Sequence, residues 1–159
     1  RRPKVNMKRQ RATIIVEVDQ RILLVENRGG LVLLPGGGIN PEESRLQAAV
    51  RELAEETGLI AESMLFLFSH ESATNCHNVF WAAASGAVLA GDDATALHFF
   101  DHGSPLLIGR MSRASRQIID RFLSMRGETA VALAFGVPGA AAAVDKSGSG
   151  AEAWPGAYI

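Results

Sequence analysis

The most informative segment of the chain is residues 35–59, which read PGGGINPEESRLQAAVRELAEETGL. It begins with a proline and three glycines, which favour a turn and which the interior of a helix or strand tolerates poorly. The residues over 44–57 then have the periodicity of an amphipathic helix. Gly58 is the residue type that most often follows the end of a helix. The stretch therefore predicts a glycine-rich loop that leads into one helix.

The same residues predict how this helix starts and which face it buries. Either Asn40 caps the helix and Glu43 completes a capping box, or Ser44 caps the helix and Gln47 completes the capping box. At about 100° per residue, one stripe of the helix collects the apolar positions. This stripe is the expected core face, and it consists of Leu46, Ala49, Val50, Leu53 and Thr57.

Three carboxylates form a second stripe beside the core face. Glu52, Glu55 and Glu56 are spaced i, i+3 and i+4, so they lie on one side of the helix and repel one another. Arg51 is the only nearby cation, and it can pair with Glu55. Such a cluster suits a hard cation, Mg²⁺ or Mn²⁺, with substrate phosphate completing the shell. Taken alone, the carboxylates also fit a solvated acidic face after a plain turn.

The spacing of the whole stretch is far more specific than the carboxylates alone. It resembles the complete Nudix box, in which the fixed positions here are Gly37, Glu43, Arg51, Glu52, Leu53, Glu55, Glu56, Gly58 and Leu59. The resemblance implies an α/β fold, the Nudix-type α/β/α sandwich around a mixed β-sheet. It also implies an enzyme that hydrolyses a nucleoside diphosphate linked to another group, using Mg²⁺ or Mn²⁺.

The resemblance also implies roles for particular residues. Glu52, Glu55 and Glu56 match the metal-binding carboxylates, and Arg51 matches the arginine that orients them. Glu43 matches the acid at the junction of loop and helix, and Gly37 and Gly58 match the turn and helix-end glycines. Independently of the resemblance, Gly36, Gly37 and Gly38 let the main chain pass close to a bound substrate, because they carry no Cβ. Glu52 is the first candidate for the general base and Glu56 the second. Asp92, Asp93 and Glu71 are candidates for a further acid at the metal site, although Asp92-Asp93 also fits a plain turn.

Residues outside the box bear on the substrate. ADP-ribose pyrophosphatases usually carry a proline where Thr74 and Asn75 stand, and dinucleoside polyphosphate hydrolases a tyrosine where Cys76 and His77 stand. These absences favour a nucleoside triphosphate as substrate by default. The alternatives are ADP-ribose, a nucleotide sugar or another diphosphate, and a non-catalytic module that senses a nucleotide. Two neighbouring aromatics, Phe80 and Trp81, are expected in the core, whereas His70 and His77 are expected at the surface.

The rest of the chain predicts further elements around this helix. Strands are expected over residues 12–18, 21–26, 31–34, 64–68, 78–84 and 97–100, with a turn at Asp19-Gln20. A second helix is expected over 112–125, with an apolar stripe formed by Ile118, Ile119, Phe122 and Leu123. The expected organisation is a basic N-terminal arm over 1–11, a Nudix domain over 12–126 and an Ala/Gly-rich C-terminal tail over 127–159.

The tail has two interpretations. Its composition favours a flexible appendage. Alternatively, residues 130–135 add a strand or pack on a second copy of the chain, with Trp154 and Tyr158 as anchors of a homodimer.

Composition limits the classes of partner. The 159 residues suit one domain, and the net charge of −1 provides no general attraction for nucleic acid, so nucleic-acid binding is expected only if the basic arm grips phosphates. The single cysteine, Cys76, points to a cytoplasmic protein. The longest apolar run, residues 130–144, is too short and too interrupted to span a membrane. A small nucleotide or diphosphate is therefore the expected partner.

Overall fold

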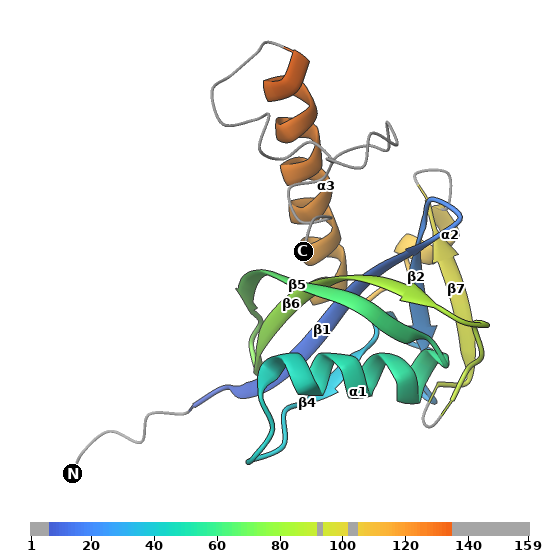
Figure 1. Ribbon diagram of the computed structural model, residues 1–159. Coiled ribbons are helices and arrows are strands. Elements are labelled where there is room, and N and C mark those ends of the chain that lie inside the picture. Colours follow the sequence, from blue (N-terminus) through green and yellow to red (C-terminus); the bar gives the residue numbers. More distant parts are fainter. Residues whose placement is uncertain (1–6, 92–93, 102–104, 135–159) are drawn as a thin grey trace.

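The sheet is built around β1 (Arg9–Val18), which pairs with strands on both sides (Figure 1). The computed structural model describes residues 7–91, 94–101 and 105–134. β1 runs parallel to β6 (Asn75–Ser85) and antiparallel to β2 (Arg21–Glu26) and β4 (Gly36–Gly38). The outer strands are β5 (Ile60–Glu71) on β6, and β3 (Val32–Leu33) and β7 (Ala96–Phe100) on β2. The sheet is therefore mixed, as expected.

Helices cover both faces of this sheet. Alternate residues of β1 point to opposite faces, so Ala12, Ile14 and Val16 belong to a core with α1 (Arg45–Thr57). Ile15 belongs to the other core, with Ile118 of α3 (Arg113–Ala134). Figure 1 shows α1 lying along the sheet while α3 rises from its other side. The expected sandwich of helix, sheet and helix is confirmed; a short helix, α2 (Pro105–Ile108), precedes α3.

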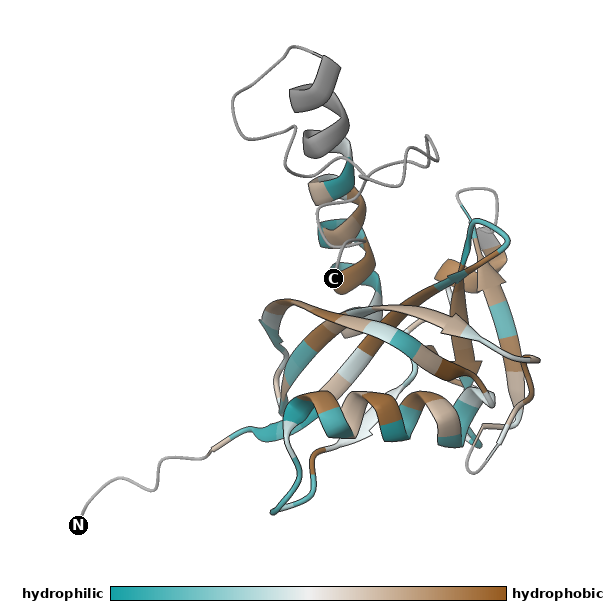
Figure 2. Ribbon diagram, in the orientation of Figure 1, coloured by the Kyte–Doolittle hydropathy of each residue, from teal (hydrophilic) through white to brown (hydrophobic). Residues whose placement is uncertain are grey.

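Hydropathy follows these layers. Figure 2 shows apolar residues concentrated along β1 and β2, where two runs of residues, 12–16 and 22–25, are buried. The turn between these strands is tight, because Asp19 and Gln20 have φ of 51° and 63°. Two consecutive residues with positive φ characterise the hairpin turn whose twist matches that of the flanking strands. The predicted turn is confirmed.

The glycine run and the middle hairpin differ from the prediction. Gly36–Gly38 was expected to be irregular, but it forms β4, because main-chain pairing with β1 needs no side chains. Residues 69–77 were expected to separate two strands, whereas β5 extends through Glu71 and β6 begins at Asn75. The polar side chains of residues 69–77 hid the ends of these strands from the hydropathy pattern. The solvent-facing side of an antiparallel sheet nevertheless commonly carries polar side chains.

The buried face of α1 is rotated from the predicted stripe. Leu46 and Val50 were expected in the core but are 46% and 41% exposed, whereas Ala48 is fully buried. Ala49 and Leu53 are buried as predicted. A small residue such as Ala48 gives little signal in a hydropathy pattern, yet it lets the helix lie close to the sheet.

The second long helix extends beyond its predicted end. α3 begins at Arg113 and continues to Ala134, so residues 130–134 are helical and do not add a strand. Its predicted apolar stripe is confirmed, since Ile118, Ile119 and Phe122 are buried and Leu123 packs against them. Trp154 and Tyr158 lie outside the described residues. None of the helices described combines the length and apolar character needed to cross a bilayer.

Candidate active site

The start of α1 is fixed by Ser44 rather than Asn40. The Ser44 hydroxyl accepts a hydrogen bond from the Gln47 amide at 3.0 Å, and the Gln47 side chain accepts one from the Ser44 amide at 2.9 Å. At the other end, Gly58 has φ of 73° and its amide donates to the Ala54 carbonyl. The two caps therefore fix where the helix begins and where it ends.

Arg51 ties the acidic residues of α1 to the loop before it. Its Nε and Nη2 donate to the two carboxylate oxygens of Glu43 at 2.7 and 2.8 Å. Its Nη1 donates to Glu52 at 2.8 Å and to Glu55 at 3.1 Å, and Nη2 also reaches the Gly38 carbonyl. The predicted pairing of Arg51 with Glu55 is thus present. One guanidinium therefore orients three carboxylates and one carbonyl.

Electrostatics keeps this ion-pair network charged. The hydrogen bonds from Arg51 lower the pKa of Glu43 to about 2, against an opposing effect of burial. The same contacts raise the pKa of Arg51 above its ordinary value. Glu43 consequently stays ionised at any physiological pH. It is placed to position Arg51, and such an acidic group is a weak proton acceptor.

Two of the helix glutamates lie directly against β4. The Gly36 amide donates to Glu56 Oε2 at 3.1 Å. The Glu52 carboxylate occupies the space where a side chain on Gly37 would project, since a Cβ there would lie 2.2 Å from Glu52 Oε1. Glu52 is only 13% exposed, whereas Glu55 is 42% exposed. The glycine strand is therefore what allows these carboxylates to gather at its edge.

The donor set at this edge fits a hard divalent cation. Glu52, Glu55 and Glu56 offer carboxylate oxygens, the ligands that Mg²⁺ and Mn²⁺ prefer. In the part of the chain that the structure describes, no three acidic, histidine or cysteine side chains converge as a ready metal-binding group. Arg51 holds Glu52 and Glu55, and Gly36 holds Glu56, so metal binding requires these side chains to exchange partners.

Two arginines of β1 complete the charge distribution around the glycine strand. A Cβ on Gly38 would lie 2.7 Å from Nη2 of Arg9, so that guanidinium lies directly beside β4. Burial lowers the pKa of Arg11, and the charges of Glu56 and Glu52 partly offset this effect. Arg11 Nε is buried without a hydrogen-bond partner among the described residues. The sequence placed both arginines in a basic arm, and only their place in β1 brings them to the site.

His77 lies next to Arg11 on the sheet and corrects another expectation. It was predicted at the surface, but it is 8% exposed and its Nδ1 lies 2.9 Å from the Thr13 hydroxyl. Burial, together with the charges of Arg11 and His70, lowers the pKa of His77 to about 4. The imidazole is consequently neutral at physiological pH. His77 is buried because β6 pairs with β1 beside Arg11. No local sequence pattern around His77 indicates this burial.

The other candidate residues lie apart from this cluster or outside the described residues. Glu71 forms an ion pair with Lys8 at 3.1 Å, and Asp92 and Asp93 lie outside the described residues. Phe80 is buried at 2% exposure, as expected of a core residue, and Trp81 packs against the core. The carboxylate cluster described is therefore limited to residues of α1 and its preceding loop.

Comparison with known proteins identifies the class to which this fold and site belong. Residues 7–121 match the family model of the NUDIX domain. A solved structure of a nudix hydrolase family member from Chromobacterium violaceum superposes with a TM-score of 0.69 and 30% identity, covering 85% of this chain and 94% of that one. The chain belongs to the Nudix family.

Two curated relatives have different names. A Methanocaldococcus jannaschii ADP-ribose pyrophosphatase is 36% identical over 98 residues, or 55% of this chain and 58% of that protein. A Bacillus subtilis (strain 168) protein named as an 8-oxo-dGTP diphosphatase is 32% identical over 113 residues, or 67% of this chain and 74% of that protein. The chain thus spans little more than half of the archaeal relative, and the two relatives are named for different substrates.

Proposed function

We propose that this protein hydrolyses the phosphoanhydride bond of a nucleoside diphosphate linked to another group, with Mg²⁺ or Mn²⁺. The observation that carries the proposal is the placement of Glu52 and Glu56 against a glycine strand, with Arg51 orienting the neighbouring carboxylates. On an ordinary solvent-exposed helix, acidic side chains extend into water and do not require a neighbouring strand that consists only of glycine. Family membership supports the same reaction.

The metal would be held by Glu52, Glu55 and Glu56. When bound, such an ion neutralises the charge that develops on the phosphate oxygens during displacement at phosphorus. Glu52 is the first candidate to accept the proton of the attacking water and Glu56 the second. Glu43 and Arg51 keep the helix carboxylates in position, and Gly36, Gly37 and Gly38 let a phosphate approach the main chain closely.

A nucleoside triphosphate is the substrate we favour, with release of a nucleoside monophosphate and pyrophosphate. The absence of the proline expected in ADP-ribose pyrophosphatases supports this choice, as does the name of the Bacillus relative. Hydrolysis of ADP-ribose or a nucleotide sugar is the second candidate, because the archaeal relative is named as an ADP-ribose pyrophosphatase.

The test is product release from a panel of nucleotides with Mg²⁺, for the wild type and for Glu56→Gln. Glu42→Gln is the matched control, since Glu42 is an exposed acid of the preceding loop. We expect turnover of at least one substrate, reduced by roughly a hundredfold or more in Glu56→Gln and unchanged in Glu42→Gln. Nucleotide binding without turnover of any member would instead show a sensing module. Full activity of Glu56→Gln would remove this residue from the proposed metal site.

A further inference from the structure

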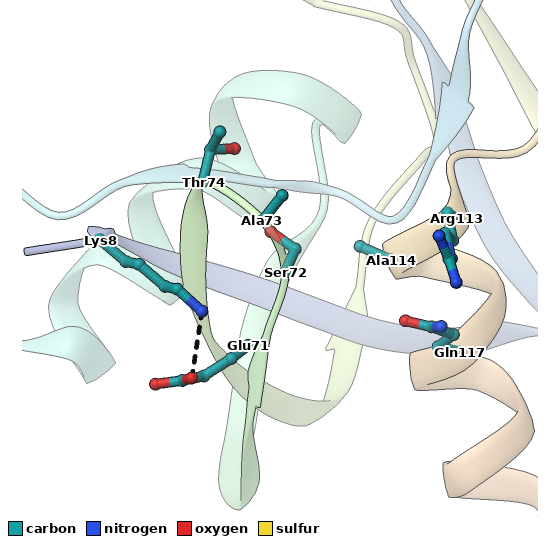
Figure 3. A pocket seen from close by; sticks show the side chains of 8 residues that line it. All are labelled: Lys8, Glu71, Ser72, Ala73, Thr74, Arg113, Ala114 and Gln117. Atoms are coloured by element: carbon teal, nitrogen blue, oxygen red, sulfur yellow. Dashed lines mark hydrogen bonds and ion pairs between the residues drawn. The ribbon is translucent and has the colours of Figure 1, made fainter. Parts of the chain in front are cut away.

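The chain that leaves β6 passes the C-terminal end of α1 before it reaches β7 (Figure 1). Two of its amides donate to carbonyls of the last helical turn, Leu89 to Thr57 at 2.8 Å and Gly91 to Glu56 at 3.1 Å. Residues 86–91 are called the brace below. The cavity between α3 and the turn joining β5 to β6 (Figure 3) lies elsewhere, since none of its lining residues belongs to the brace.

The last turn of α1 concentrates negative charge. Its carbonyl groups have no partners within the helix, and they place a partial negative charge at this end. Glu55 and Glu56 add two carboxylates, and no basic residue lies in the same turn. Negative charge is least favourable at the C-terminal end of a helix, so this turn tends to fray when no cation is bound. The two amides of the brace offset part of this charge.

Gly91 lies so close to α1 that a side chain has no room. A Cβ there would lie 2.4 Å from the main-chain oxygen of Glu55, so main chain would have to shift. Backbone conformation is not the reason for the glycine, because Gly91 is not among the described glycines whose φ is positive. A Cβ on Gly58 would likewise lie 3.2 Å from the Ala87 carbonyl oxygen. The position of the helical turn therefore depends on the position of the brace.

The brace is anchored on both sides, so it cannot simply follow the helix. On one side it continues from β6, and Val88 packs against the core that α1 shares with the sheet. On the other side, the Ala94 amide donates to the Gly91 carbonyl at 3.0 Å. The Thr95 amide then donates at 2.8 Å to the carbonyl of Glu26, the last residue of β2. The sheet thus holds the brace, and the brace holds the end of the helix.

We propose that Gly91 is a positioning residue for Glu55 and Glu56, because the brace holds their main chain where a divalent cation needs it. The inference rests on the proposed function, since it concerns the metal that these glutamates would bind. Both glutamates must release their present hydrogen-bond partners when they bind a metal. With the main chain held by the brace, this exchange requires only rotation of the two side chains.

Metal affinity tests the inference without catalysis. Mn²⁺ is titrated into the full chain and followed by electron paramagnetic resonance, for the wild type, Gly91→Ala and Gly109→Ala. Gly109→Ala is the matched control, because the added Cβ would make an ordinary contact of 3.9 Å with the Leu106 carbonyl oxygen. We expect Gly91→Ala to weaken Mn²⁺ binding about tenfold and the control to leave it unchanged. Unchanged Mn²⁺ affinity in Gly91→Ala would overturn the inference.

Kinetics separates positioning from a purely structural role. We expect Gly91→Ala to lower kcat about tenfold at limiting Mg²⁺ and to recover most of this loss at saturating Mg²⁺, because a weakened site still fills at high metal concentration. The KM for nucleotide at saturating Mg²⁺ should stay within about twofold of the wild-type value. A lowered Tm with an unchanged dependence of kcat on Mg²⁺ would show that the brace serves only the fold.

Hydrogen exchange on the wild type covers the case in which Gly91→Ala does not fold. Coupling between two sites is reciprocal, so a metal bound at the glutamates should protect the amides of the brace. We expect saturating Mn²⁺ to slow exchange in the peptide that contains residues 86–91 about threefold or more, and to leave the loop over 27–31 unchanged. An unchanged rate at the brace contradicts the inference.

The outcomes also separate this inference from the proposed function. A wild type that binds no Mn²⁺ contradicts the proposed metal site, and the inference falls with it. Binding to the wild type that is lost in Glu56→Gln but retained in full by Gly91→Ala contradicts the brace alone.

Discussion

Among single residues, Arg51 has the most contacts in the site, because its planar guanidinium makes several directed hydrogen bonds at once. It binds both oxygens of Glu43 and one oxygen each of Glu52 and Glu55. A lysine carries the same charge but offers no fixed fork of donors. The geometry of the contacts, rather than the charge alone, therefore orients the carboxylates.

We expect Arg51→Lys to lower kcat/KM by about 10- to 100-fold, because groups that orient metal ligands typically contribute that much. Metal affinity, measured by Mn²⁺ titration, should fall in parallel. The control is Arg45→Lys on the same helix, since Arg45 lies over the ring of Phe66 rather than on the carboxylates. An Arg51→Lys enzyme with unchanged metal affinity would contradict this role.

His77 gives a pH dependence to stability. Its folded pKa of about 4 lies below its ordinary value of 6.5, so the unfolded chain binds the proton more readily. The folded state therefore loses stability as the pH falls from about 6.5 to about 4. We expect the wild type to lose about 5 °C more of its Tm over this window than His77→Asn does. Parallel Tm curves for the two proteins would show that His77 does not contribute.

At the scale of elements, β4 serves two purposes through adjacent glycines. A Cβ on Gly36 would lie 2.2 Å from the main-chain oxygen of Ala12, which strand pairing holds in place. A Cβ on Gly37 would instead meet the end of the Glu52 side chain, which can move. Gly36 is therefore required for strand pairing with β1, and Gly37 for the position of the Glu52 carboxylate.

The two glycines should respond differently to substitution. We expect Gly36→Ala to lower the free energy of unfolding by about 2–4 kcal/mol, because main chain must shift. Gly37→Ala should cost about 1 kcal/mol or less but lower kcat strongly by displacing Glu52. Urea unfolding and steady-state kinetics on both variants check this. Equal loss of stability in the two would show that Glu52 cannot move away.

At the scale of the whole molecule, two cores share the sheet. Leu53 of α1 and Phe122 of α3 are fully buried on opposite faces, and β1 contributes to both cores. Because the same strands line both cores, the layers should unfold together. The sheet thus links the helix that carries the glutamates to the long helix on its opposite face.

We expect Leu53→Ala and Phe122→Ala each to lower the free energy of unfolding by about 3–5 kcal/mol, within a single cooperative transition. Leu46→Ala on the exposed face of α1 should change it by about 1 kcal/mol or less, although the hydropathy pattern placed Leu46 in the core. Thermal unfolding followed by circular dichroism and fluorescence checks both points. Transitions that differ between the two probes would show that the layers unfold separately.

The Nudix box, its helix and most of the strands could be predicted from the amino-acid sequence. These depend on local properties: the caps of α1, the spacing of its glutamates and the β-branched residues of β1. The resemblance to the Nudix box also assigned Glu43 to the loop–helix junction. Local signals of this kind survive in a single sequence because neighbouring residues act on one another directly.

The surroundings of that helix, in contrast, depend on the tertiary structure. Pairing with β1 made a strand of Gly36–Gly38 and buried His77. It also brought Arg9 beside Gly38 and Arg11 near Glu52 and Glu56. These features depend on which strands become neighbours, and that choice is made by burial of the whole sheet rather than by any local pattern.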